Sequence, residues 1–466
     1  MSYRPSCARL ALTLTLLPLA GCPERELAKV PIRADVVENV NIPLDDNRDV
    51  DILFVIDNSL SMEAEQDSLA ANFPLIIDRL RASAIQPSVH LGVISTDVGG
   101  GELCGGTGDT GTLLTGASDC NAINNGGNFL SDIVNADGTR STNYDGDLRD
   151  AFSCMARLGT DGCGFEQPLE AVKQAIDNPA NEAFFRDGAY LAIIFITDED
   201  DCSVSGPELL RDSGDRSPAA LESQLGPESS FRCFEFGVKC DETGGPREDG
   251  VRNNCIPRED SEFMNSVASY IEHVRGSKRF PTQIFTAAIA GELSPVAVEH
   301  RDSMRFPFAI PQLAYSCDSA LGEAVPPVRL AAFLGAFQGP DSPTSICRDD
   351  LAESVREIAD LFDFVGPGCL EGSLVDASDE PGLQPDCSVT EVVNPDIEGE
   401  VETVLRECNN AADPKSSSVT PCYVIYDEPE CANEVTGLAV EVVYAEGYTV
   451  PPFTRAEVSC VGIAPI

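Results

Sequence analysis

Residues 190–201 read YLAIIFITDEDD, and this stretch decides the fold. Its apolar part, Tyr190–Ile196, is nearly continuous, as a strand buried on both faces of a sheet requires. Further apolar runs recur along the chain, with helical patterns between them. We expect strands at Asp51–Ile56, Val89–Ser95, Ala189–Ile196, Gln283–Ala290 and Val328–Leu334.

Amphipathic helices are predicted between these strands, because apolar residues recur there at three- and four-residue spacing. The stripes run from Leu69 to Leu80, Phe165 to Ile176, Phe263 to Val274 and Leu351 to Leu361. Pro74 interrupts the first stripe and is expected to kink or restart that helix. The alternation predicts an α/β fold with a doubly wound, mostly parallel sheet and helices on both sides.

The composition of the 466-residue chain excludes several function classes. Lys and Arg number 31 against 77 Asp and Glu, a net charge of −46. This balance argues against binding to nucleic acid or, through a basic patch, to anionic lipid. Only three histidines are present, which argues against a His-rich zinc site. The 18 cysteines indicate an oxidising compartment.

Residues 1–22 have the pattern of a lipoprotein signal peptide. The apolar run Leu10–Leu19 is too short to span a bilayer but suits a signal-peptide core. It ends in Leu19-Ala20-Gly21-Cys22, which resembles a bacterial lipobox, whose cysteine is diacylated and becomes the mature N-terminus. We expect Cys22 to anchor the protein in the cell envelope, at the outer membrane because Pro23 follows rather than Asp.

The remaining chain divides into three segments. Residues 23–48 are polar and acidic and are expected to form a tether. Residues 49–365 form the α/β domain, with long insertions at 98–146 and 203–256 that need bracing. Residues 366–466 contain six cysteines and short strand patterns such as Cys422–Tyr426 and Leu438–Tyr444, which predicts a small disulfide-rich β domain.

The sixteen cysteines beyond Cys22 could form up to eight disulfides. Cys154 with Cys163 and Cys422 with Cys431 are close in sequence and are candidate pairs, while the full connectivity stays open. Cys202 is expected to be disulfide-bonded rather than a nucleophile, since no histidine lies near it in sequence.

Polar residues that carry chemistry follow two of the predicted strands. Asp57-Asn58-Ser59-Leu60-Ser61 comes after the first strand, and Thr197-Asp198-Glu199 follows Ile196. Between these two motifs in the sequence, Gly159-Thr160 precedes a predicted helix. In a parallel sheet such turns lie at the carboxyl edge, where ligands bind. Three loops could thus bring together the hard oxygen ligands that Mg²⁺ prefers.

These residues resemble the metal-ion-dependent adhesion site of the von Willebrand factor type A family. Asp57, Ser59 and Ser61 match its DxSxS motif. Thr160 matches the distal threonine and Asp198 the distal aspartate. The resemblance implies that the three hydroxyls bind Mg²⁺, or Mn²⁺ or Ca²⁺, and that the two aspartates bind it directly or through water. It also implies that the ion accepts a carboxylate from a protein partner.

The resemblance covers roughly residues 50–365 and is nearest to the cysteine-rich, type-A-domain surface lipoproteins of myxobacteria. Two positions depart from the family pattern. Leu60 and Glu199 stand where glycine is frequent in the family. Glu199 therefore adds negative charge beside the predicted site.

We expect a lipid-anchored envelope protein that binds a partner through its cation, in adhesion or complex assembly. It is not expected to be an enzyme, because no histidine or cysteine base lies near the motif. A structural surface protein cemented by cations is an alternative, and a metal-dependent hydrolase that uses metal-bound water is another. A plainer interpretation of the motif is that Ser59 and Ser61 only cap a helix.

Overall fold

The computed structural model describes most of the chain. Described are residues 35–44, 49–82, 86–116, 120–124, 126–135, 137–242, 244–365, 368–370, 372–377, 383–395, 397, 399–410, 414, 417–428, 431 and 436–463. The expected signal peptide at 1–22 and the acylated Cys22 lie outside these residues. Among the helices that are described, none is both long and apolar enough to cross a membrane.

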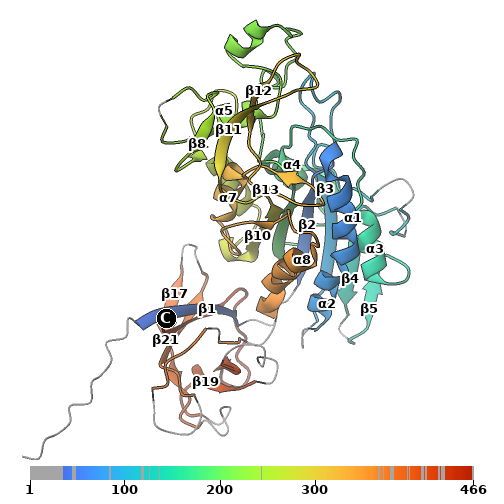
Figure 1. Ribbon diagram of the computed structural model, residues 1–466. Coiled ribbons are helices and arrows are strands. Elements are labelled where there is room, and N and C mark those ends of the chain that lie inside the picture. Colours follow the sequence, from blue (N-terminus) through green and yellow to red (C-terminus); the bar gives the residue numbers. More distant parts are fainter. Residues whose placement is uncertain are drawn as a thin grey trace, which may run out of the picture.

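A seven-stranded sheet forms the centre of the α/β region, in the order β15-β10-β6-β2-β3-β4-β5 (Figure 1). Its strands are β2 Val50–Ile56, β3 Val89–Ser95, β4 Leu130–Val134, β5 Arg140–Thr142, β6 Tyr190–Ile196, β10 Ile284–Ala290 and β15 Thr344–Ser345. From β15 to β3 neighbours are parallel, whereas β4 and β5 pair antiparallel. The predicted strands β2, β3, β6 and β10 are confirmed, and the first insertion extends the sheet.

Helices cover both faces of this sheet. Phe54 and Ile56 of β2 belong to the core under α1 Glu63–Asn72, α2 Pro74–Ala82, α3 Leu148–Met155 and α8 Ala352–Ala359. Leu53 and Val55 belong to the opposite core under α4 Pro168–Asp177, α6 Val267–Arg275 and α7 Val328–Leu334. All residues of β2 and β6 are buried, as two covered faces require. Pro74 restarts the first helical segment as α2.

The expected strand at Val328–Leu334 is wrong, because this segment is helix α7. A short apolar run is compatible with a buried helix as well as with a strand. The Asp200 carboxylate accepts hydrogen bonds of 3.0 Å from the backbone N–H groups of Arg329 and Leu330, at the start of the helix. This contact stabilises a helical N-terminus and comes from a distant part of the sequence.

The C-terminal region consists of two small sheets. One has the order β1-β21-β16-β17, formed by β1 Asp35–Pro43, β21 Arg455–Ile463, β16 Cys387–Val393 and β17 Val401–Val404. The other contains β18 Arg406–Glu407, β19 Cys422–Asp427 and β20 Leu438–Val443. The predicted short strands near 422 and 438 are therefore confirmed.

The expected tether at 23–48 is wrong for residues 35–43, which form strand β1. This strand pairs antiparallel with β21 along its whole length (Figure 1). Val40 and Ile42 pack into the core of the C-terminal region. An edge strand that buries few side chains gives little apolar periodicity in the sequence. The N-terminal segment thus belongs to the C-terminal β region.

Eight disulfides pair all sixteen cysteines beyond Cys22. They are Cys104–Cys163, Cys120–Cys154, Cys202–Cys233, Cys240–Cys255, Cys317–Cys347, Cys369–Cys431, Cys387–Cys460 and Cys408–Cys422. The candidate pairs Cys154–Cys163 and Cys422–Cys431 are wrong, because bridging depends on Cα separation in the fold rather than on sequence distance. The number of bridges and the pairing of Cys202 are confirmed.

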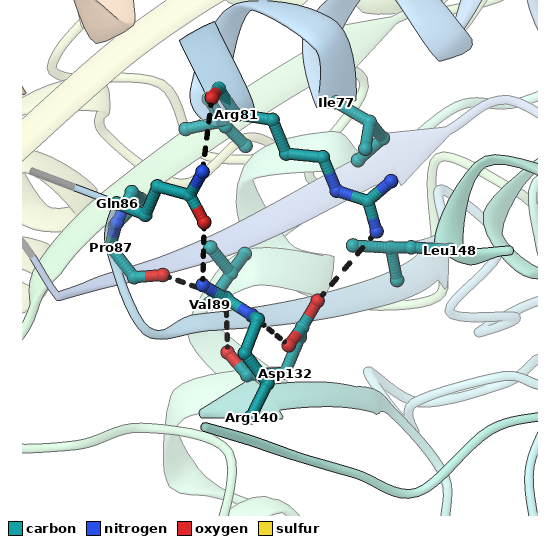
Figure 2. A pocket seen from close by; sticks show the side chains of 9 residues that line it. Ile77, Arg81, Gln86, Pro87, Val89, Asp132, Arg140 and Leu148 are labelled. Atoms are coloured by element: carbon teal, nitrogen blue, oxygen red, sulfur yellow. Dashed lines mark hydrogen bonds and ion pairs between the residues drawn. The ribbon is translucent and has the colours of Figure 1, made fainter. Parts of the chain in front are cut away.

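Buried carboxylates at the amino end of the sheet are matched by basic side chains. Asp51 of β2 is fully buried, and its oxygens lie 2.7 Å from Arg186 Nε and 3.7 Å from Lys278 Nζ. Asp132 of β4 pairs with Arg140 and lies 3.9 Å from Arg81 (Figure 2). The cavity beside Asp132 measures only about 10 Å³, which leaves room for no more than a single water.

Candidate functional site

Asp57 directly follows β2 and is fully buried at the carboxyl edge of the sheet. Its Oδ1 accepts a 2.8 Å hydrogen bond from the Ser59 N–H, and its Oδ2 accepts one of 2.7 Å from the Thr197 hydroxyl. Ile56 and Ile196 are paired neighbours in parallel strands. The two polar turns that follow these strands therefore meet, as the sequence predicted.

The two motif serines and Asp198 lie at the same place. Ser59 Oγ and Ser61 Oγ are 3.0 Å apart, and Ser61 lies close enough to Asp198 to counteract part of the rise in the pKa of that carboxyl. Asp198 Oδ1 is buried and has no hydrogen-bond partner among the described residues. An unsatisfied buried carboxylate oxygen is unfavourable. A proton or a ligand from outside the chain could satisfy this oxygen.

Helix capping does not account for Ser59 and Ser61. Ser59 precedes the short helix Leu60–Met62 but makes no side-chain capping hydrogen bond, and Met62 stands at the cap position of α1. The interpretation that these serines only cap a helix is therefore wrong.

The structure brings the Thr160 loop to the site but does not join Thr160 to the other predicted donors. Gly159 has φ 84°, a left-handed conformation that favours glycine. The Gly162 N–H donates a 2.9 Å hydrogen bond to the Asn58 carbonyl. Among the described residues, no hydrogen bond links the Thr160 hydroxyl to Asp57, Ser59, Ser61 or Asp198. Its role as a donor stays a prediction.

Five carboxyl groups are linked by charge repulsion, although no three of them converge on one point, and we call them the acidic cluster: Asp57, Glu65, Glu166, Asp198 and Glu199. Glu199 is half-buried and the other four are buried. Burial raises the pKa of Asp198 to about 8, and the charge of Asp57 adds to this effect. Burial also raises the pKa of Glu166 and Glu199 well above the usual value, reinforced by the charges of their neighbours. Burial is also the main reason why the pKa values of Asp57 and Glu65 are raised.

No basic side chain neutralises this cluster within the described part of the chain. None of its five members has an ion pair there with Lys, Arg or His. Two more of its oxygens, Glu65 Oε2 and Glu166 Oε1, are buried without a hydrogen-bond partner. Negative charge thus accumulates at a buried position, which favours either proton uptake or a bound cation.

Sequence reasoning missed Glu166 and Thr197 as parts of the site. Glu166 is fully buried and accepts a hydrogen bond from the Thr96 hydroxyl, at the end of β3. No motif spacing links Glu166 to the DxSxS turn. Thr197 could have been found, because it directly precedes Asp198 at the end of a predicted strand.

The side chains present fit a hard divalent cation. No three His, Cys, Asp or Glu side chains of the described residues converge as a metal centre of those residue types would require. The predicted set instead combines two carboxylates with serine and threonine hydroxyls. Oxygen donors alone, an orphaned carboxylate oxygen and excess negative charge suit Mg²⁺, Mn²⁺ or Ca²⁺ rather than a softer metal.

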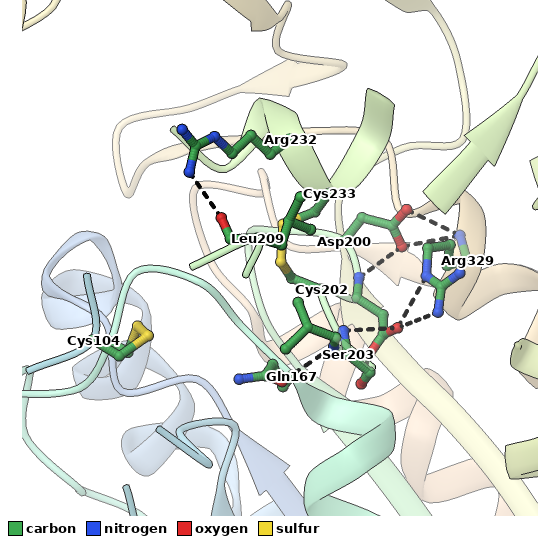
Figure 3. Close-up of a disulfide and its surroundings, with 12 residues drawn as sticks. Cys104, Gln167, Asp200, Cys202, Ser203, Leu209, Arg232, Cys233 and Arg329 are labelled. Atoms are coloured by element: carbon green, nitrogen blue, oxygen red, sulfur yellow. Dashed lines mark hydrogen bonds and ion pairs between the residues drawn. A yellow bond between two sulfur atoms is a disulfide. The ribbon is translucent and has the colours of Figure 1, made fainter. Parts of the chain in front are cut away.

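The chain immediately after the site is firmly fixed. Figure 3 shows Arg329 next to Asp200, near the Cys202–Cys233 disulfide. Arg329 and Asp201 are both buried and lie 2.9 Å apart. The disulfide ties the second insertion to the turn that carries Asp198. The second insertion therefore braces this turn.

Sequence comparison finds no matching family model and no matching curated protein. Among solved structures, a von Willebrand factor type A protein from Catenulispora acidiphila is 14% identical with a TM-score of 0.29, covering 94% of this chain and 62% of its own. The pilus adhesin SpaC of Lactobacillus rhamnosus GG, in its open conformation, is 10% identical with a TM-score of 0.32, covering 92% and 41%.

The three N-terminal domains of the type V pili tip protein Mfa5 from Porphyromonas gingivalis are 11% identical with a TM-score of 0.28, covering 93% of this chain and 69% of that one. This chain thus spans less than two thirds of the first two neighbours. At such TM-scores the similarity does not establish family membership, which stays a prediction.

Proposed function

We propose that this protein is a non-catalytic binding protein that holds a divalent cation at its acidic cluster and binds a carboxylate of a protein partner through that cation. Asp57, Ser59, Ser61 and Asp198 would hold the ion, with Thr160 as a further donor. The observation that carries the proposal is the buried acidic cluster, for which the described chain provides no basic partner.

The cation would supply a positive charge where an acidic group from outside can bind. The chain itself carries a net charge of −46. At a Debye length of about 8–10 Å, most of this charge is screened from an approaching partner. Local attraction at the rim would therefore come from the bound cation.

The non-catalytic character is proposed from the side chains around the cluster. Cys202 is bonded to Cys233 and is not available as a thiolate. His90 Nδ1 lies 3.0 Å from the Phe184 carbonyl oxygen, and His273 and His300 lie near Asp177 and Asp249. A nucleophile pair of the Ser–His or Cys–His type would need one of these residue types at the cluster.

The cellular location in this proposal is the bacterial envelope, with the protein held on the membrane through acylated Cys22. The eight disulfides are typical of proteins that fold in an oxidising compartment. Mass spectrometry of the protein from bacterial membranes tests the anchor, since a diacylated Cys22 should be the first residue.

Titration calorimetry of the metal-free full chain with Mg²⁺, Mn²⁺ and Ca²⁺ tests the cation site. Asp57→Asn should abolish binding. Asp67→Asn, the same change on helix α1 at a side chain that is 73% exposed, should preserve it. Equal cation affinity of Asp57→Asn and the unaltered chain would contradict the proposal. Assembly on adding Ca²⁺ that is insensitive to Asp57→Asn would instead support a cation-cemented surface protein.

A further inference from the structure

Gln66 lies on helix α1 with 4% of its surface exposed, between the DxSxS turn and the loop that carries Thr160. Its Nε2 donates hydrogen bonds of 2.9 Å to the Asp57 carbonyl and 2.9 Å to the Gly159 carbonyl. Its Oε1 accepts hydrogen bonds of 3.1 Å from the Leu158 N–H and 3.2 Å from the Gly159 N–H.

These four contacts use the whole hydrogen-bonding capacity of a glutamine amide, which has two N–H donors and an oxygen with two acceptor sites. Three of them go to Leu158 and Gly159, directly before Thr160. The fourth goes to the backbone of Asp57. One side chain therefore connects the end of β2 to the loop that contains the third set of predicted donors.

The same loop is held from its other side. The Gly162 N–H donates to the Asn58 carbonyl, and a Cβ at Gly162 would come within 2.2 Å of Asn58 Oδ1. Thr160 is therefore bracketed by contacts that both lead back to the DxSxS turn.

We infer that Gln66 is a positioning residue of the cation site, which holds the Thr160 loop beside the DxSxS turn so that the Thr160 hydroxyl can join the other donors when a cation binds. This inference rests on the proposed function and adds a residue for which the DxSxS pattern has no counterpart. A purely structural glutamine would also satisfy these backbone groups, but its loss would weaken cation binding equally with and without the Thr160 hydroxyl.

A double-mutant cycle separates these two roles. Mn²⁺ affinity is measured for the unaltered full chain, Gln66→Met, Thr160→Ala and the double variant. Gln66→Met keeps the side-chain length but removes all four hydrogen bonds. We expect it to weaken Mn²⁺ binding about tenfold, as other residues that orient metal ligands do. In the Thr160→Ala background the further loss should be below about twofold.

Gln174→Met is the matched control, because the Gln174 amide donates to Glu170 on helix α4 and does not contact the site. It should leave Mn²⁺ affinity unchanged. An unchanged affinity in Gln66→Met, or the same loss in both Thr160 backgrounds, would overturn the inference while leaving the cation site intact. An unaltered chain that does not bind Mn²⁺ would overturn the proposed function, and the role of Gln66 with it.

Amide hydrogen exchange provides a readout without any metal. In the metal-free chain the Leu158 and Gly159 N–H groups should be protected by Gln66 Oε1, and Gln66→Met should make them exchange faster. Unchanged protection of both amides would show that Gln66 does not fix the loop.

Discussion

A buried aspartate lies at each end of strand β2, and the two differ in whether basic side chains of the described residues pair with them. Asp51 at the amino end and Asp57 just beyond the carboxyl end are both fully buried. Asp51 has Arg186 and Lys278 beside it. Asp57 belongs to the acidic cluster, which has no ion pair with a basic side chain among the described residues.

A buried charge without a partner is unfavourable by several kcal/mol, so proteins usually pair such groups. This chain does so at Asp132 with Arg140 and at Asp201 with Arg329. Asp201 is only three positions beyond Asp198, so arginine is within reach of this edge of the sheet. The missing partner at the acidic cluster, among the described residues, is therefore a local property, and it supports the proposed cation from outside the chain.

The largest effect on stability is expected from removing a basic partner at the amino end, so that its buried aspartate is left unpaired like those of the acidic cluster. Arg186→Met leaves Asp51 buried without its nearest cation and should lower the free energy of unfolding by about 3–5 kcal/mol. Arg157→Met is the control for urea unfolding, because the Arg157 side chain is 50% exposed. Its loss should stay below about 1 kcal/mol. Equally small losses would mean that this fold tolerates unpaired buried charge.

The next largest effect on stability is expected from supplying the acidic cluster with a positive charge, as basic side chains do for the aspartate at the amino end. Mg²⁺ at about 100 times its Kd should raise the free energy of unfolding by about 2.7 kcal/mol, because it binds only the folded chain. Asp57→Asn should lose this gain and Asp67→Asn should keep it. Urea unfolding with and without Mg²⁺ measures both, and an equal response of the two variants would speak against the site.

The pH dependence of the metal-free chain should also report on the carboxyl edge. The pKa of Asp198 is raised to about 8 by burial and by Asp57, whereas an unfolded aspartate has a pKa near about 3.9. Its protonated form stabilises the fold fully below the unfolded pKa, and this contribution is lost as pH rises towards about 8.

The metal-free chain should therefore lose stability between about pH 4 and pH 8, by about 1.4 kcal/mol for each unit of net pKa shift. Urea unfolding at both pH values measures this loss. Asp198→Asn removes one of the titrating groups and should make the profile shallower, and Mg²⁺ should do the same for the unaltered chain. A metal-free profile that is unaffected by Asp198→Asn would contradict the expectation.

The smallest effect is expected at Glu199, which stands where the resembling family often has glycine. Glu199→Gln removes one ionisable carboxyl group from the acidic cluster and should weaken Mg²⁺ affinity by about fivefold, equivalent to about 1 kcal/mol. Glu63→Gln is the control, since Glu63 is exposed on helix α1. Calorimetry that gives the same affinity for both variants would exclude Glu199 from the site.

Local patterns in the sequence were sufficient for much of the fold. Strands β2, β3, β6 and β10 could be predicted because their runs are buried on both faces. Helix α7 could not, since Asp200 contacts its start from more than a hundred residues away. Strand β1 was missed because its partner β21 is at the other end of the chain.

The site divides in the same way. Asp57, Ser59, Ser61 and Asp198 lie directly after predicted neighbouring strands, so the parallel sheet brings them together. Glu166 and Gln66 reach the site through contacts between segments that are distant in the sequence, and no residue spacing along the chain predicts them. The Thr160 loop follows an insertion whose path depends on disulfides, which a sequence cannot assign.

Anomalous diffraction from crystals of the full chain soaked in Mn²⁺ is the most direct test of whether a divalent cation occupies the acidic cluster. We predict one strong peak within about 2.0–2.6 Å of the Ser59 and Ser61 hydroxyl oxygens and of an Asp198 carboxylate oxygen. The absence of a peak there, or a peak only at exposed carboxylates elsewhere, would contradict it.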